Sequence, residues 1–368
     1  MSVSGEWFGS SSPTDQRVLW DTAEFQFLAV SLTSGIVLAE FPDLHVSKLS
    51  YRLEDTTSGT MILPWRNIPS NWDEATIPYG VAVLLVRDST VLWGGIIVKR
   101  ERTLQGNGLT LTLASVEHYF NSVYVKDCTY SGWEQTWIAS NLVTTTLEGH
   151  RFGIEVETAA SSIHRDRTYE ESSDKTLLSA LQELSSVQNG PEWCTSWHAS
   201  GGRYVPVLTI ADRIGASRPV TTFDESVMTS FKVVEDYTSG YGANMVVAVG
   251  SSTGEDQLRS DVMVADQSYR PVVECVVRPS SSITQKETLN AHALSSLQYV
   301  QNGTNTVSME LSLMAAPVVY KEWEPGDMVA WTIADDSGRF NGFDHGEARV
   351  VGYDIDFTGV WTITPVLQ

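Results

Sequence analysis

Histidine and cysteine, the side chains that most often carry out chemistry, are scattered singly through this sequence. No two histidines are four residues apart, and no C-x-x-C pair, H-E-x-x-H motif or phosphate-binding G-x-x-x-x-G-K-[ST] loop is present. Catalysis and metal binding need several such side chains to lie close together. Each histidine and cysteine is therefore better explained as a surface or structural residue. The residues concerned are His45, His118, His150, His164, His198, His292, His345, Cys128, Cys194 and Cys275.

Two further patterns could bring reactive groups together. Cys194 and His198 are four residues apart in a predicted strand, so they share one face and could form a thiol–imidazole pair. A buried cysteine on an aromatic-rich strand explains the same residues more simply. Neighbouring carboxylates could serve acid–base chemistry or hold a cation, but 45 acidic residues produce such neighbours by density alone. Turns or solvated faces better explain these pairs, which are Asp335/Asp336, Asp354/Asp356 and Glu170/Glu171.

Aromatic residues offer a non-catalytic chemistry, the stacking of sugar rings. The sequence has 12 Trp, and several lie in its N-terminal part. Trp also contributes heavily to cores and subunit interfaces, so carbohydrate binding is kept as an alternative. We expect no enzymatic activity, no metal site and no cofactor. The stacking residues would be Trp7, Phe8, Trp20, Trp65, Trp72 and Trp93.

Composition limits the class of protein that positions these groups. The chain has 368 residues, 42% of them apolar, which is enough for buried cores in two or three domains. Its 24 Lys+Arg and 45 Asp+Glu give a net charge of −21, which excludes a sequence-independent grip on nucleic-acid phosphates. No apolar run reaches the roughly 20 residues of a membrane span, and no signal peptide is expected. Isolated cysteines indicate reduced thiols of a protein made in a cytoplasm.

Most of the sequence is typical of β-strands. Three runs, Val81–Val86, Val91–Val98 and Leu109–Leu113, predict a meander with turns at 87–89 and 105–108. Further strands are expected at 205–211, 245–249, 272–277, 307–313 and 328–333.

Three amphipathic helices are predicted between these strands. Ser131 with Glu134, and Thr284 with Glu287, form capping boxes that would begin the first and third helices. The second would follow residues 172–174. The three apolar stripes are Trp133, Trp137, Ile138 and Leu142; Leu177, Leu178, Leu181, Leu184 and Val187; and Leu289, Ala293, Leu297 and Val300.

A faint internal repeat links the two ends of the chain. Self-similarity of this kind predicts two copies of one β-unit, although any meander alternates strands and turns. The matching segments, in order, are 77–82, 94–98 and 108–112 in the first copy and 324–330, 348–353 and 359–364 in the second.

The order of these parts resembles the tail hub proteins of long-tailed bacteriophages, specifically hub-type minor tail proteins of phages that infect actinobacteria. The likeness extends over nearly the whole chain as an order of elements, and short motifs carry it. These are residues 92–102 with 109–113, 117–120, 174–184 leading to Trp193 and Trp197, 244–250, Arg270-Pro271 and 325–327.

The resemblance implies a mainly β fold with α+β inserts, in which two tail-tube-like β-barrel domains and smaller α/β domains assemble as a trimeric ring. The first barrel would occupy 1–119, and 120–212 would be an α/β insert domain. The second barrel would combine 213–262 and 304–368, and 263–303 would be a small helical insert.

The resemblance also implies a function: a structural minor tail protein of the virion that forms the trimeric hub at the tail tip. It would join the hexameric tail tube and distal tail protein above to a tip fibre or spike below. Tape measure protein and phage DNA would occupy its channel, without specific DNA binding, and the chain would not insert into a membrane. The alternative is a carbohydrate- or receptor-binding β-protein of the tail tip.

Overall fold

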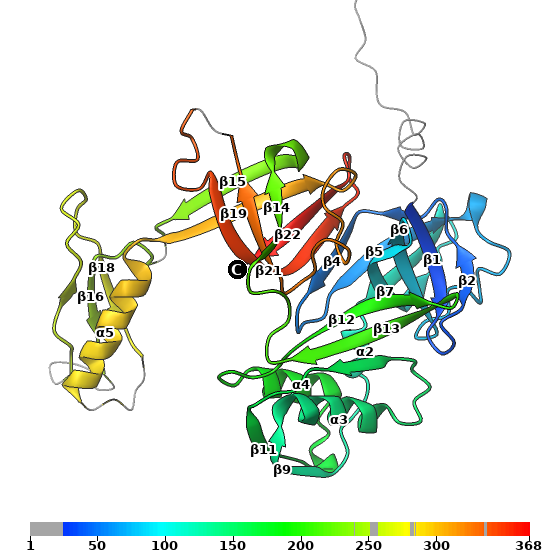
Figure 1. The fold of residues 1–368 in the computed structure, drawn as a ribbon, viewed down its shortest axis with the longest axis horizontal. Helices are drawn as coiled ribbons and strands as arrows, with labels where there is room; N and C mark the ends of the chain where they lie inside the picture. The colour runs from blue at the N-terminus through cyan, green and yellow to red at the C-terminus, as the bar shows by residue number, and fades with distance from the viewer. Residues whose placement is uncertain (1–24, 239, 251–256, 280–282, 284, 335–336) are drawn as a thin grey trace, which may run out of the picture. The chain divides into compact units, whose positions relative to one another are not determined.

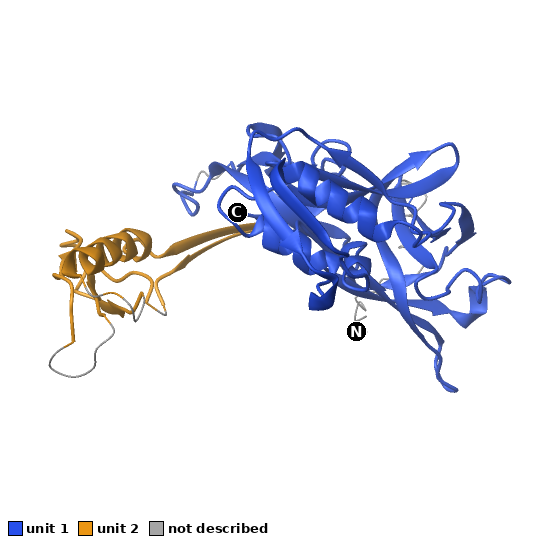
Figure 2. Ribbon diagram, turned by 90° about the horizontal axis from the view of Figure 1, so that it is seen from below, with its two compact units in different colours: residues 1–230, 309–368 blue, residues 231–308 orange. Residues whose placement is uncertain are grey.

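The computed structural model describes residues 25–368 except 239, 251–256, 280–282, 284 and 335–336. The fold is mainly β, and the chain forms two compact units (Figures 1 and 2). Unit 1 comprises residues 1–230 and 309–368, and unit 2 comprises 231–308. No helix within the described ranges combines the length and apolar character needed to cross a bilayer.

The N-terminal sheet of unit 1 is built around the predicted meander, which is confirmed. β6, β7 and β8 are antiparallel neighbours. The turn between β6 and β7 consists of Asp88 and Ser89, with φ of 47° and 74°. Positive φ at both residues is typical of the two-residue hairpin turn that matches the twist of the flanking strands. The strand order is β2-β1-β6-β7-β8-β5-β3. The strands are β1 (Phe25–Ser31), β2 (Val37–Glu40), β3 (His45–Val46), β5 (Ser58–Pro64), β6 (Val81–Arg87), β7 (Thr90–Glu101) and β8 (Gly108–Ala114).

The C-terminal sheet contains a second meander, β20-β21-β22, and its strand order is β14-β20-β21-β22-β19-β15. Its middle strand has 12 residues and an irregularity in its register, like β7 in the first meander. The order of elements expected for an internal repeat is therefore present. The strands are β14 (Pro219–Asp224), β15 (Met228–Asp236), β19 (Thr304–Ser312), β20 (Met328–Thr332), β21 (His345–Asp356) and β22 (Thr362–Leu367).

One strand from the N-terminal part belongs to the C-terminal sheet. β4 (Lys48–Arg52) pairs with the second half of β21. By contrast β3, which ends two residues before β4 begins, pairs with β5 of the N-terminal sheet. Aromatic side chains fill the space that this pairing creates between the two sheets. Phe25 lies 5.4 Å from Trp361, and Phe27 lies 6.1 Å from Phe357, measured between ring centroids.

A third layer of unit 1 covers part of the N-terminal sheet. This layer contains the three-stranded sheet β10-β13-β12, with helices packed on it (Figure 1). Trp197 of β12 packs against Leu28, Leu84 and Ile96 of the N-terminal sheet. The elements are α2 (Glu117–Phe120), β9 (Cys128–Glu134), α3 (Gln135–Leu147), β10 (Glu155–Thr158), β11 (His164–Tyr169), α4 (Leu177–Ser185), β12 (Glu192–Ser200) and β13 (Arg203–Ala211). Short 3-10 turns occur at Trp65–Asn67, Glu171–Ser173 and Glu225–Val227.

The start predicted for the first helix is wrong. Ser131 and Glu134 lie in strand β9, where Trp133 pairs with Arg165 of β11, and the helix begins at Gln135. Glu134 is instead the last residue of β9 and the N-cap residue of the helix, and it makes no side-chain capping hydrogen bond. Only the later part of the stripe faces the core: Ile138 and Leu142 are buried.

The other two helices form, with different caps. The hydroxyl of Thr176 accepts a hydrogen bond from the backbone N–H of Ser179 and begins α4, whereas Ser172 and Ser173 lie in the preceding 3-10 turn. In α5 (Lys286–Val300) the buried stripe is as predicted, with Leu289, Ala293 and Leu297. Thr284 lies outside the described residues.

Unit 2 contains α5 and the three-stranded sheet β17-β16-β18. The strands are β16 (Met245–Ala248), β17 (Met263–Val264) and β18 (Glu274–Val277). The domain boundaries expected at 262/263 and 303/304 stay a prediction.

Gly94 should be essential for the packing of β7 on β12. A Cβ at this position would lie 2.6 Å from Leu84 Cδ2 and closer still to the Trp197 indole. Gly94→Ala should therefore destabilise the protein by about 1–3 kcal/mol, as overpacking does. Urea unfolding measures this. Gly153→Ala, which meets only ordinary contacts, is the control and should change the stability far less.

Candidate functional site

The predicted thiol–imidazole pair does not become a reactive site. Cys194 is half-buried and His198 is exposed near the end of β12. Loss of solvation raises the pKa of the Cys194 thiol well above its ordinary value, and nearby carboxylates including Glu324 and Glu117 raise it further. A thiol that holds its proton is a poor nucleophile.

The carboxylate pairs are largely engaged in structural contacts. Asp354 forms ion pairs with Lys48 (3.0 Å) and Arg52 (2.8 Å). Burial acts to raise its pKa, but hydrogen bonds from Ser50, Lys48 and Arg52 outweigh burial and the pKa is lowered. Asp356 accepts a hydrogen bond from the backbone N–H of Thr358. Asp335/Asp336 lie outside the described residues, and Glu170/Glu171 are exposed.

No group of three or more His, Cys, Asp or Glu side chains in the described part of the chain has a metal-binding arrangement. 

Among the described residues that could stack sugars, Trp93 lies apart from the neighbouring Trp65 and Trp72. Trp93 is buried, and its indole N–H donates to the Ser50 carbonyl at 2.9 Å. Trp65 and Trp72 are an edge-on pair with centroids 5.7 Å apart, and the guanidinium of Arg102 lies 5.3 Å from the Trp72 ring centre. Trp7, Phe8 and Trp20 lie outside the described residues.

The exposed tryptophan pair is elsewhere, at Trp133 and Trp137. Their side chains are 44% and 52% exposed and their ring centroids are 5.6 Å apart. They meet because β9 runs directly into α3 at Gln135. Sequence reasoning placed both on a buried helical stripe, and therefore missed them as a surface feature.

The feature that sequence reasoning could not find is a polar face along both sheets of unit 1. On the N-terminal sheet, Thr112 of β8 pairs with Thr60 of β5 and Lys99 of β7. Directly paired residues point to the same side of a sheet, so these side chains form one row. The next row is Glu101, Thr110 and Ile62.

The C-terminal sheet continues this pattern. Asp354 pairs with Ser50 and Thr364, and Asp356 pairs with Lys48 and Thr362. The rows of the two sheets adjoin along the β3–β4 segment, because β3 pairs with one sheet and β4 with the other. An open polar cavity of about 510 Å³ lies on the C-terminal part. Its lining residues are Lys48, Thr229, Glu310, Asp354, Asp356, Thr358, Val360, Thr362 and Thr364.

Hydroxyls and paired charges give this polar face its chemistry. Lys48 and Arg52 are held by Asp354, and Lys99 is held by Glu101 at 2.7 Å. Because each of these cations has a carboxylate beside it, the polar face carries no excess of positive charge for nucleic-acid phosphates.

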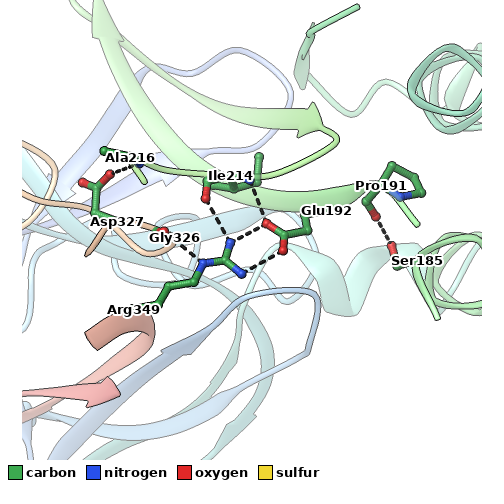
Figure 3. Close-up of polar contacts among 8 residues, drawn as sticks. All are labelled: Ser185, Pro191, Glu192, Ile214, Ala216, Gly326, Asp327 and Arg349. Carbon is green, nitrogen blue, oxygen red and sulfur yellow. Dashed lines mark hydrogen bonds and ion pairs between the residues drawn. The ribbon is translucent and has the colours of Figure 1, made fainter. Parts of the chain in front are cut away.

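A polar junction in unit 1 ties the third layer to the C-terminal sheet (Figure 3). Arg349 of β21 forms a two-pronged ion pair with Glu192 of β12, and its Nη1 donates to Oε1 at 2.8 Å. The guanidinium also donates to the carbonyls of Ile214 (2.9 Å) and Gly326 (3.0 Å). Glu192 in turn accepts from the backbone N–H of Ile214 at 2.7 Å.

Two further contacts reinforce the junction on either side (Figure 3). Asp327, which is buried, accepts from the backbone N–H of Ala216 at 2.6 Å. The hydroxyl of Ser185 donates to the Pro191 carbonyl at 2.6 Å and fixes the end of α4 to the start of β12. The chain that leaves β13 is therefore held by Glu192 and Arg349 at Ile214 and by Asp327 at Ala216.

Glu54 brings a second carboxylate close to Arg349. It lies in the turn between β4 and β5 with a φ of 58°, a left-handed conformation that is uncommon for this residue type. Burial raises its pKa from 4.5 to about 7, and the negative charge of Glu192 raises it as well. The Trp193 backbone N–H and Arg349 act in the opposite direction.

Comparisons with known proteins identify the fold. No family model and no curated protein matches the sequence. Among solved structures, a 43 kDa tail protein of prophage MuSo2 from Shewanella oneidensis is 11% identical with a TM-score of 0.53, covering 93% of this chain and 98% of that one. A tail protein from Neisseria meningitidis MC58 is 12% identical with a TM-score of 0.52, covering 93% and 96%. The chain thus has a fold similar to that of phage tail proteins.

Arg349→Met should show how much the junction contributes to stability. The substitution leaves Glu192, whose side chain is only 25% exposed, without its partner, so a loss of about 2–3 kcal/mol is expected in urea unfolding. The matched control is Lys99→Met, which removes an exposed pair and should change the stability far less. Similar losses in the two variants would contradict a special role for the junction.

Glu54 should make stability fall as the pH rises. Its pKa is about 7 in the folded state and 4.5 in the unfolded state. Its stabilising contribution is therefore complete below pH 4.5 and is lost as the pH rises from 4.5 to about 7. Between pH 5 and 8 the wild type should lose about 1–2 kcal/mol more unfolding free energy than Glu54→Gln, allowing for solvent screening. Glu171→Gln, at an exposed carboxylate, should behave like the wild type.

Proposed function

We propose that this chain is a structural protein of a phage virion, the homotrimeric hub at the tail tip. The observation that carries the proposal is the polar face of unit 1, a surface of hydroxyls and internally paired charges. The similarity in fold to phage tail proteins over 93% of the chain supports the same assignment.

In this proposal three copies form a ring and their polar faces line the channel through which DNA leaves. The net charge of −21 adds to the repulsion of phosphates. The two meanders would belong to two tail-tube-like barrels, at 1–119 and at 213–262 with 304–368, so that three chains present six similar units to a hexameric tube. The inserts would be 120–212 and 263–303.

The partners follow from that position. The distal tail protein and tail tube would bind above, a tip fibre or spike below, and tape measure protein would lie in the channel. The work is symmetry matching and channel lining, and no catalytic step is part of it. The actinobacterial host group is carried over from the resemblance noted in the sequence.

The trimer is the first part of the proposal to test. Light scattering of the purified chain should give about three times the chain mass of 40.6 kDa, and negative-stain images of the same peak should show rings. A monomer at every concentration would contradict a hub that assembles on its own.

A second candidate function is carbohydrate or receptor binding at the tail tip, and the exposed Trp133–Trp137 pair favours it. Exposed aromatic faces stack on sugar rings. If the chain is monomeric, glycan binding that is lost in Trp137→Ala but kept in Trp65→Ala would support this alternative over the hub.

A further inference from the structure

A cavity of about 150 Å³ in unit 1 adjoins the junction at Arg349, since Ile214 belongs to both. Its walls come from β12 and β13, from the segment that follows β13, and from the loop that precedes β20. At about 30 Å³ per water molecule, the cavity has room for roughly five waters or for a molecule the size of glycine or alanine. Its polar lining residues are Cys194, Ser196, Thr209, Arg213, Tyr320 and Glu324.

One side of the β12–β13 pair forms the floor of this cavity. Cys194 and Thr209 are directly paired in the register of the two strands, so their side chains lie on the same side of the sheet. Ser196, two residues further along β12, lies on that side as well. Trp193 and Ile210, one residue away in each strand, pack against the helices of the third layer instead. The floor therefore offers a thiol and two hydroxyls.

The other two walls are held in place by the junction (Figure 3). The backbone N–H of Ile214 donates to Glu192, and the carbonyls of Ile214 and Gly326 both accept from Arg349. The two walls touch at Gly215 and Gly326, where a Cβ on Gly215 would lie 2.1 Å from the Gly326 carbonyl carbon. The cavity is therefore pre-formed, which lowers the cost of ordering the protein around a ligand.

Tyr320 lines the cavity with a strained backbone. Its φ of 61° lies in the left-handed region, which is an outlier for a bulky residue. Neighbouring contacts maintain this conformation: its backbone N–H donates to the Trp323 carbonyl at 2.7 Å, and its ring lies edge-on to that of Tyr353, with centroids 6.2 Å apart. Strained residues cluster at ligand-binding sites, so the loop before β20 has a feature of such a site.

The two charged groups of the cavity are not neutralised within the described part of the chain. The side chains of Arg213 and Glu324 make no hydrogen bond and no ion pair with any described residue. Burial raises the pKa of the Glu324 carboxyl, the charge of Asp327 raises it further, and His198 lowers it. The Arg213 guanidinium is not among the charges that act on Glu324, so the two groups lie apart.

The polar cavity of the C-terminal sheet shows the contrast. There Lys48 and Asp354 line one cavity and form an ion pair with each other at 3.0 Å. In the cavity beside the junction, a guanidinium and a carboxylate line the walls without such a pair. Both groups are therefore available to a ligand that carries the two opposite charges.

We propose that this cavity binds a small zwitterion, an α-amino acid of about the size of glycine or alanine. The ligand carboxylate pairs with the Arg213 guanidinium and the ligand ammonium pairs with the Glu324 carboxylate, while Ser196 and Thr209 offer further hydrogen bonds. A ligand with a single charge would leave one of the two groups unpaired. The inference goes beyond the proposed hub and does not depend on the trimer.

Isothermal titration calorimetry of the full-length chain tests the site. Glycine should bind in a one-to-one ratio with a Kd of about 1 mM or lower, since a pre-formed cavity supplies partners for both of its charges. Acetate and methylammonium each carry one of the two charges. Both should bind at least about tenfold more weakly than glycine, because each leaves one cavity group unpaired.

Two substitutions remove the cavity charges one at a time. In Glu324→Gln and Arg213→Gln a polar side chain remains at a position that reaches solvent, so each variant should fold. Each should weaken glycine binding by about tenfold or more. The matched controls are Glu171→Gln and Arg218→Gln, at exposed residues outside the cavity, which should bind glycine like the wild type.

Thermal unfolding provides a second readout. At ten times its Kd, glycine should raise the Tm of the wild type and of both controls by about 2 °C, because it binds only the folded chain. The same concentration should leave the Tm of Glu324→Gln and Arg213→Gln nearly unchanged.

Three outcomes contradict the proposed site. Absence of saturable glycine binding up to about 10 mM would mean that the cavity holds only water. Acetate that binds as tightly as glycine, and depends on Arg213 alone, would indicate an anion site. Methylammonium that binds as tightly, and depends on Glu324 alone, would indicate a cation site. The proposed hub would survive each of these results, because light scattering tests the trimer separately.

Discussion

The pairing of one short segment, residues 45–52, is the constraint on which unit 1 depends. β3 pairs with β5 of the N-terminal sheet, and β4 pairs with β21, about three hundred residues further along the chain. The Arg52 side chain fixes this pairing by donating to the Tyr353 carbonyl and to Asp354. Closing so long a loop has an entropic cost, which the burial of Tyr51 against Tyr353 and of Phe27 against Phe357 offsets.

The junction at Arg349 connects the third layer to the C-terminal sheet, just as the β3–β4 segment connects the two sheets to each other. The guanidinium binds Glu192 and two backbone carbonyls, so its hydrogen-bonding groups are largely used within the protein. Glu54, two residues beyond the segment that links the sheets, places a second carboxylate close to Arg349. The charge of Glu192 raises the pKa of Glu54 and the charge of Arg349 lowers it, so the β4–β5 turn and the junction are electrostatically coupled.

The polar face of unit 1 and the outer side of the unit 2 sheet differ in chemistry. The polar face of unit 1 keeps its cations paired with its own carboxylates and presents threonine hydroxyls between them. Such a surface has no excess of positive charge with which to hold a polyanion. In unit 2, the side of the β17-β16-β18 sheet turned away from α5 exposes Val264 and Val276, with the charged residue Glu274 on the same side.

The sequence by itself determined the local elements whose signals lie within a few residues. The β6–β8 meander, the stripes of α4 and α5 and the turn at Asp88 follow from alternation, helical spacing and turn chemistry. Only the tertiary structure decided which elements pair at a distance. Ser131 and Glu134 match a capping box, but the ladder with β11 made them a strand and exposed Trp133. The polar face and the place of β4 depend on registers between distant strands, and no local pattern specifies a register.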